Sequence, residues 1–224
     1  MRRKILLVCG ILSPLMYALA DALAGTLSGS YSFRDQTISE LGAIGAASRT
    51  LFSALLIPTY LLLAAFGVGV WQSAEGRRGV RIVGGILIGL GVLALTVGQF
   101  VPMRQRGTEQ GLSGTLHLVE GIAAMLFLFT AMGFAAAAFG KRFRIYTIIT
   151  IALILAFGVW TSTHAARLEA GSATPWLGVI ERIWWYAYQL WFVVLGITLL
   201  RQHADECGPH SGSLRHPTPH RVAQ

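Results

Sequence analysis

The sequence predicts an all-α integral membrane protein, built as a bundle of six transmembrane helices. Hydrophobic residues make up 54% of the 224 residues and charged residues only 12%, whereas a soluble domain averages about 25% charged residues. The mean hydropathy is positive, at +0.60. Six apolar runs are each long enough to cross a hydrocarbon core, which takes about 20 residues of α-helix.

The predicted spans are separated by short linkers in which basic residues gather on one side. In chain order they are Ile5 to Leu27, Leu51 to Trp71, Ile82 to Val101, Leu116 to Phe139, Ile145 to Thr163 and Ile183 to Leu200. Basic clusters precede the first span, separate the second from the third and the fourth from the fifth, and follow the sixth. The positive-inside rule then places both termini in the cytoplasm. The expected location of the protein is the plasma membrane. Arg104 and Arg106 run against this rule, because they fall in a loop assigned to the outside.

The two ends of the chain carry separate predictions. Residues 1–201 form the transmembrane domain, and residues 202–224 a disordered cytoplasmic tail rich in Gly, Ser and Pro. The tail histidines are better explained by a solvated tail than by a metal site. Residues 1–20 also resemble a cleavable signal peptide, whose removal would leave five helices. A membrane helix is favoured because the apolar run exceeds an h-region of about 7–15 residues.

Between the first two spans lies a polar loop, Tyr31 to Ser48. Thr37 and Glu40 have the spacing of a capping box, which predicts a short helix beginning near Ile38. Glu40 therefore has two interpretations, a helix cap or a functional carboxylate.

Glycines recur every seven residues along the third span, at Gly84, Gly91 and Gly98. Such a face lets another helix backbone approach closely. It is expected to serve either packing within one chain or a homodimer.

Ionisable residues within apolar runs cost about 2.5–3.5 kcal/mol on insertion scales and are functional candidates by default. In this chain they fall on the outward side, where they predict a polar pocket. The residues are Asp21, Glu40, His117, Glu120, His164, Glu181 and Arg182.

The first functional hypothesis is a membrane-embedded hydrolase or transferase acting on a lipid or amphiphile. His117 and Glu120 share a helix face at i,i+3 spacing and would act with Asp21 as catalytic residues. His117 and His164 would be ligands of a divalent metal that activates water, or would bridge a haem.

Glu40, Glu181 and Arg182 are the candidate substrate-binding residues, with Arg182 contacting an anionic head group. The alternative function is a non-catalytic protein that binds or transports a lipid or solute. The same polar residues would then form a recognition or structural network, in which Arg182 pairs with Glu181 or Asp21 and His117 pairs with Glu120. Membrane lipids, and not nucleic acid, are the expected partners in both cases, because the basic residues accounting for the net charge of +8 sit between membrane spans.

Three stretches resemble the prokaryotic multipass membrane family of domain of unknown function 998. They are TISELGAIG from Thr37 to Gly45, the stretch from Phe100 to His117, and Gly178 to Arg182 followed by Trp185 and Trp191. The first is also faintly similar to an outer loop of Frag1/DRAM/Sfk1 membrane proteins. In the family an acidic residue often follows Phe-x-Pro, whereas Met103 to Arg106 follow it here. The resemblance spans roughly Ile5 to Leu200 and implies six helices and a grouping of Glu40, His117, Glu181 and Arg182, with no established reaction.

Overall fold

The computed structural model describes residues 1–206, and over these residues the chain is built from helices and loops. The elements are α1 (Arg2–Leu27), α2 (Ile38–Leu41), α3 (Arg49–Gln72), α4 (Arg78–Leu93), the π-helical segment η1 (Ala94–Gly98), α5 (Gly111–Ala138), α6 (Lys141–Ser162), α7 (Ala165–Glu169) and α8 (Leu177–Glu206). Within residues 1–206, six helices are long and apolar enough to cross a membrane, with η1 continuing α4. The predicted all-α, six-helix fold is confirmed. The tail beyond residue 206, with His210, His216 and His220, lies outside the described residues.

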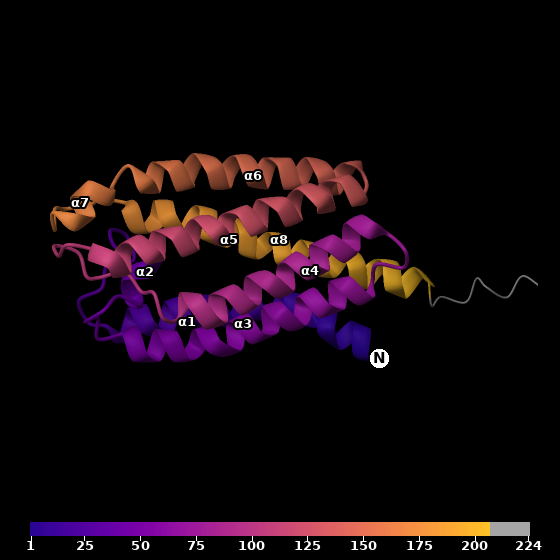
Figure 1. The fold of residues 1–224 in the computed structure, drawn as a ribbon, viewed down its shortest axis with the longest axis horizontal. Coiled ribbons are helices and arrows are strands. Elements are labelled where there is room, and N and C mark those ends of the chain that lie inside the picture. Colours follow the sequence, from indigo (N-terminus) through magenta and orange to yellow (C-terminus); the bar gives the residue numbers. More distant parts are fainter. Residues whose placement is uncertain (207–224) are drawn as a thin grey trace, which may run out of the picture.

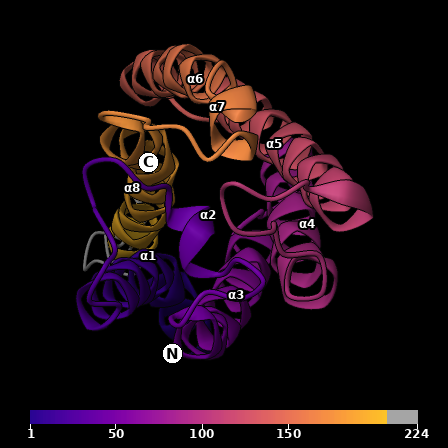
Figure 2. The ribbon, with the colours of Figure 1, turned by 90° about the vertical axis from the view of Figure 1, so that its left-hand side faces the viewer.

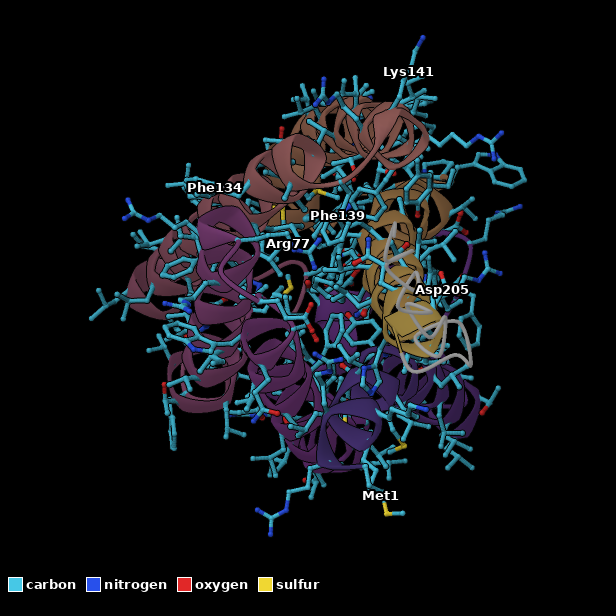
Figure 3. All side chains as sticks on the ribbon, turned by 90° about the vertical axis from the view of Figure 1, so that its right-hand side faces the viewer. Met1, Arg77, Phe134, Phe139, Lys141 and Asp205 are labelled. Atoms are coloured by element: carbon cyan, nitrogen blue, oxygen red, sulfur yellow. The ribbon has the colours of Figure 1, made fainter. Side chains whose placement is uncertain are left out.

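The six long helices lie side by side along one axis (Figure 1). Seen end-on, they form a ring in which contacts run from α1 through α3, α4, α5, α6 and α8 and back to α1 (Figure 2). The short helix α2 lies across the middle of the ring at one end, which we call the lid end. The opposite end, called the basic end, carries Met1, Arg77, Lys141 and Asp205 (Figure 3).

Glycines bring α3 and α4 into backbone contact. A Cβ atom added to Gly67 would lie 2.6 Å from the backbone nitrogen of Ile88, and one added to Gly91 would lie 2.9 Å from that of Ala64. Gly84 packs in the same way against the backbone of Trp71. Gly84 and Gly91 of the predicted glycine face thus pack against α3 within the chain. A homodimer through Gly84, Gly91 and Gly98 stays a prediction.

The inward face of α5 is packed more tightly toward the basic end than toward the lid end. On the inward face of α5, Leu128, Met132 and Ala135 are fully buried, whereas His117 and Glu120, on the same face nearer the lid, are only partly buried. A second, smaller core lies under the lid. It consists of Tyr17, Ala20, Ala24, Ile38, Leu41, Phe52 and Leu56.

The helix boundaries differ from the prediction where polar residues have partners in the fold. α8 begins at Leu177 instead of Ile183 and continues to Glu206, beyond the predicted start of the tail. At its start, Glu181 and Arg182 bond to the loop before α2 and to α2 itself, so this polar turn stays inside the bundle. At its end, Gln202 accepts a hydrogen bond from Arg77 at 3.3 Å. Hydropathy alone does not register such contacts.

Candidate functional site

Helix α2 (Ile38–Leu41) with its N-cap Thr37, which we call the lid, is held in shape by its own capping residues. The Glu40 carboxylate accepts hydrogen bonds from the backbone N–H of Thr37 at 2.8 Å and from its hydroxyl at 3.1 Å. The predicted capping box and the short helix from Ile38 are both present. Ile38 and Leu41 point into the core under the lid and are buried there. Glu40 is therefore a helix cap, whatever else it does.

A buried ion pair joins α1 to α8 beneath the lid. The Arg182 guanidinium donates to both carboxylate oxygens of Asp21, from Nε at 2.9 Å and from Nη2 at 2.7 Å. The Arg182 side chain is 13% exposed and that of Asp21 only 4%. The Tyr186 hydroxyl also donates to Asp21, at 2.7 Å. Of the two partners open to Arg182 from the sequence, the fold selects Asp21.

The remaining donors of Arg182 hold the loop before the lid. Nη1 reaches the carbonyl oxygens of Phe33 at 2.9 Å, Gly178 at 3.1 Å and Gln36 at 3.2 Å. Nη2 also donates to the Tyr31 hydroxyl at 2.7 Å. Each nitrogen of the guanidinium thus has acceptors within the chain. Arg182 has no donor left for a ligand head group in this conformation.

Glu181, the neighbour of Arg182, fastens α2 directly to α8. Its buried carboxylate accepts hydrogen bonds from the backbone N–H of Ile38 and, at 3.4 Å, from the hydroxyl of Ser39. The first-turn N–H groups of a helix lack partners within the helix, so Glu181 satisfies one of them. Asp21, Glu181 and Arg182 together act as the anchor of the lid.

A second ion pair joins the lid to the loop between η1 and α5. Arg106 donates to the Glu40 carboxylate from Nε at 2.6 Å and from Nη2 at 2.9 Å. This hydrogen-bonded carboxylate raises the pKa of Arg106. Nη1 of Arg106 has no hydrogen-bond partner within residues 1–206. Sequence reasoning missed Arg106 as a site residue, although its place in a loop assigned to the outside was the available signal.

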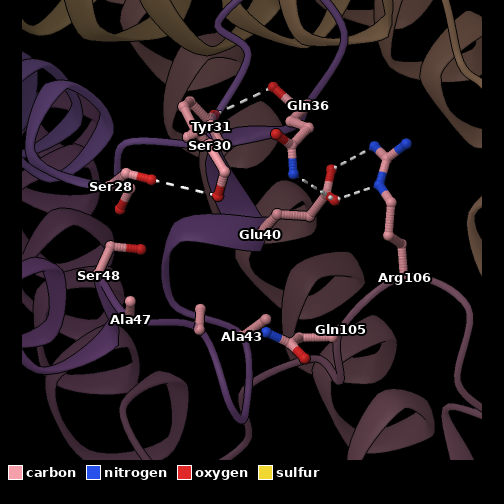
Figure 4. Close-up of a pocket in the computed structure, with 11 residues that line it drawn as sticks. Ser28, Ser30, Tyr31, Gln36, Glu40, Ala43, Ala47, Ser48, Gln105 and Arg106 are labelled. Atoms are coloured by element: carbon pink, nitrogen blue, oxygen red, sulfur yellow. Dashed lines mark hydrogen bonds and ion pairs between the residues drawn. The ribbon is translucent and has the colours of Figure 1, made fainter.

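A pocket of about 230 Å3 opens beside this ion pair. In Figure 4 the Glu40 carboxylate lies between Gln36 and Arg106, and Gln105 lies lower in the same view. The side-chain amide of Gln105 also makes no hydrogen bond to the described residues. The pocket is lined by Ser28, Ser30, Tyr31, Gln36, Glu40, Ala43, Ala46, Ala47, Ser48, Gln105 and Arg106.

The remaining predicted site residues lie outside this pocket. Nδ1 of His117 is 3.0 Å from the carbonyl oxygen of Val101. Because a carbonyl only accepts, Nδ1 carries the proton. The expected hydrogen bond between His117 and Glu120 is not formed in the described part of the chain. Nδ1 of His164 lies 3.1 Å from the carbonyl oxygen of Trp160. Within residues 1–206, no group of three or more His, Cys, Asp and Glu side chains is placed to hold a metal ion.

Six membrane-length helices closed at one end by an anchored lid define a multipass membrane protein. A family model described as protein of unknown function (DUF998) matches residues 11–198, and the chain belongs to this family. The comparisons with curated proteins and with solved structures give no match. The resemblance noted from the three sequence stretches is thereby confirmed, and the activity has to be argued from the site.

Proposed function

We propose that this protein is a non-catalytic binding protein, which holds a small polar head group of a lipid, or a solute of the same chemistry, in the pocket at the lid end. The observation that carries the proposal is a pair of donors in that pocket, Nη1 of Arg106 and the amide of Gln105, which have no hydrogen-bond partner among residues 1–206. By the positive-inside rule the basic end faces the cytoplasm, so both termini lie inside and the pocket faces outward across the plasma membrane.

The size of the pocket favours a head group over a whole lipid. Its 230 Å3 correspond to about seven or eight water molecules at roughly 30 Å3 each. Pockets that enclose a drug-sized ligand measure about 300–1,000 Å3. A phosphoethanolamine group suits the smaller volume, and its acyl chains would remain in the bilayer beside the bundle.

The charge of the pocket favours a ligand without net charge. Glu40 already balances Arg106, with two hydrogen bonds between them. A zwitterionic head group adds no net charge to this pair. Its phosphate can accept from Nη1 of Arg106 and from the Gln105 amide, and its ammonium can approach the Glu40 carboxylate. An anionic head group would find no unpaired cation among the described residues that line the pocket.

The enzyme hypothesis receives less support from the geometry. Asp21, Glu181 and Arg182 are engaged in anchoring the lid. His117 bonds to a backbone carbonyl and not to Glu120. A general acid or base must reach its substrate directly or through one water, and neither His117 nor Glu120 lines the pocket.

The test is binding of a short-chain phosphatidylethanolamine, dihexanoyl phosphatidylethanolamine, to the full chain in detergent, measured by calorimetry. Gln105→Ala should weaken binding about two- to tenfold, because one hydrogen bond contributes about 0.5–1.5 kcal/mol. The Gln105 side chain bonds to nothing in the described chain, so folding should be unaffected. Gln72→Ala, an exposed glutamine at the end of α3 nearer the basic end, is the matched control and should bind like wild type. Equal affinities for Gln105→Ala and Gln72→Ala would contradict the proposal.

A further inference from the structure

Two basic clusters that are distant in the sequence meet at one corner of the basic end. A Cβ atom on Gly79 would lie 3.6 Å from the Cβ atom of Ala138 and 3.7 Å from the carbonyl oxygen of Phe134, so the start of α4 packs on the end of α5. The helix α6 begins directly after this end of α5. We call the basic residues at the starts of α4 and α6 the basic corner. They are Arg77, Arg78, Arg81, Lys141, Arg142 and Arg144.

Side-chain contacts join the two clusters through the end of α5. The guanidinium carbon of Arg77 lies 5.7 Å from the centre of the Phe139 ring, and Figure 3 shows these two side chains beside each other. From the other cluster, Nε of Arg144 donates to the carbonyl oxygen of Ala136 at 3.0 Å. Both clusters therefore border the same short segment of the chain.

Four cations of the basic corner are exposed and have no counter-charge in the described chain. None of the four makes a hydrogen bond or an ion pair within residues 1–206, and the segments 76–108 and 121–168 contain no Asp or Glu. By contrast, Arg3 at the start of α1 forms an ion pair with Glu75. The four unpaired cations are Arg78, Arg81, Lys141 and Arg142.

These unpaired cations do not stabilise the helices that carry them. Positive side chains in the first turn of a helix oppose the helix macrodipole, and neither α4 nor α6 has an acidic residue there. The positive-inside rule explains why basic residues flank the spans at this end. It does not require two clusters to meet at one corner. The arrangement points to an anion from outside the chain.

The residues that follow the clusters place the basic corner at the edge of the lipid-facing surface. Ile82 follows Arg81 and is 38% exposed, and Ile145 follows Arg144 and is 47% exposed. The head groups of a bilayer lie directly beyond its hydrocarbon core. A lipid with its acyl chains beside Ile82 and Ile145 would therefore bring its phosphate to the basic corner. A soluble phosphate compound would make no use of these apolar neighbours.

We propose that the basic corner binds the head group of an anionic phospholipid. Arg78 and Arg142 would donate to phosphate oxygens, which arginine bonds through pairs of N–H groups. Arg81 and Lys141 would add positive charge, which attracts anionic lipids to basic clusters beside membrane spans. The basic corner lies at the opposite end of the bundle from the lid, and its ligand does not depend on the function proposed for the pocket there.

The test is binding of palmitoyl-oleoyl phosphatidylglycerol to the full chain in an uncharged detergent, measured from lipid adducts by native mass spectrometry. The double variant Arg78→Gln with Arg142→Gln should weaken binding about tenfold or more, because each basic residue near the membrane surface adds to the attraction. Arg78→Lys with Arg142→Lys keeps both charges and should retain most of the binding.

The matched control removes two exposed charges elsewhere at the basic end. It is Arg2→Gln with Lys4→Gln, at the start of α1. Met1 and Lys141 lie on opposite sides of this end in Figure 3, so the control should bind like wild type. Equal affinities for the two glutamine double variants would overturn the proposal, as would the lack of any saturable binding by wild type.

Two further compounds identify the ligand as an anionic lipid. Palmitoyl-oleoyl phosphatidylcholine has the same acyl chains without a net charge and should bind weakly. Glycerol 3-phosphate has the phosphate without the chains and should not compete. Equal binding of the two lipids would overturn the proposal, and so would displacement of the lipid by an equal concentration of glycerol 3-phosphate, which would identify a soluble ligand.

Thermal unfolding separates binding from folding in the same samples. Because Arg78 and Arg142 have no partner in the described chain, Arg78→Gln with Arg142→Gln should melt at or above the temperature of wild type. A large loss of stability in this variant would overturn the proposal, because it would give these side chains a structural role.

Discussion

Replacing Asp21 with Asn tests whether the buried ion pair anchors the lid. The change leaves the Arg182 guanidinium, 13% exposed, without its counter-charge. Breaking a buried pair by removing one partner costs about 3–5 kcal/mol. We expect the lower end, because Arg182 keeps the carbonyl oxygens of Phe33, Gln36 and Gly178 as acceptors. For a chain of this size, about 3 kcal/mol lowers the melting temperature by roughly 6–12 °C.

The assay is thermal unfolding of the purified chain in detergent, followed by tryptophan fluorescence. Asp205→Asn, at an exposed carboxylate near the basic end, is the control and should melt like wild type. In the double variant Asp21→Asn with Arg182→Gln, the loss should be smaller than the sum of the single losses, because the two residues are coupled. A shift of less than about 2 °C for Asp21→Asn would refute the reasoning, because the pair would then contribute no more than an exposed one.

Three further changes test packing and the loop. Gly67→Ala should lower stability by about 1–3 kcal/mol in thermal unfolding, because its Cβ would meet the backbone of α4, whereas Gly121→Ala, with open space around it, should not. Trp191→Phe should cost about 1–3 kcal/mol, since the indole N–H donates to the buried Thr147 hydroxyl at 3.0 Å; an unchanged melting curve would contradict this. The guanidinium of Arg34, which donates hydrogen bonds to the Asp35 carboxylate, lowers the pKa of Asp35. The contribution of the ionised Asp35 carboxylate to folding stability is therefore complete above the ordinary aspartate pKa and is lost as the pH falls through the lowered value. The melting temperatures of wild type and Asp35→Asn should therefore converge only below about pH 4.

Hydropathy predicts the membrane spans well, because burial in a bilayer requires long apolar helices whatever their neighbours are. All six predicted spans correspond to long helices, and the local capping signal at Thr37 correctly predicts α2. The errors fall where tertiary contacts decide the local structure. α5 begins at Gly111 and α8 at Leu177, both earlier than hydropathy suggests. In α8 the added turn contains polar groups whose hydrogen-bond partners lie in other elements. A hydropathy window along the sequence does not include those partners.

The residues of the pocket were harder to predict than the residues of the anchor. Asp21 and Arg182 stand out in the sequence because each interrupts an apolar run. Arg106 and Gln105 occupy a loop where polar residues are ordinary, and their role depends on that loop meeting the lid. The meeting is fixed by contacts such as the hydrogen bond from the Ile44 backbone N–H to the Met103 carbonyl oxygen, at 2.9 Å. A contact between distant loops has no local signature in one sequence.

The polar groups fall into two sets, those whose donors and acceptors have hydrogen-bond partners within the described chain and those whose donors and acceptors do not. Those of the anchor are saturated, and their loss should reduce stability before it affects any ligand. Gln105, Arg78 and Arg142 have no partner in the described chain, and Arg106 retains one nitrogen without a partner there. Replacing these residues should weaken ligand binding with little loss of folding stability. Arg106 is the exception, because its Nε and Nη2 also donate to Glu40. Comparing melting temperature with ligand affinity across these variants therefore separates structural residues from functional ones, whichever ligand the protein binds in the cell.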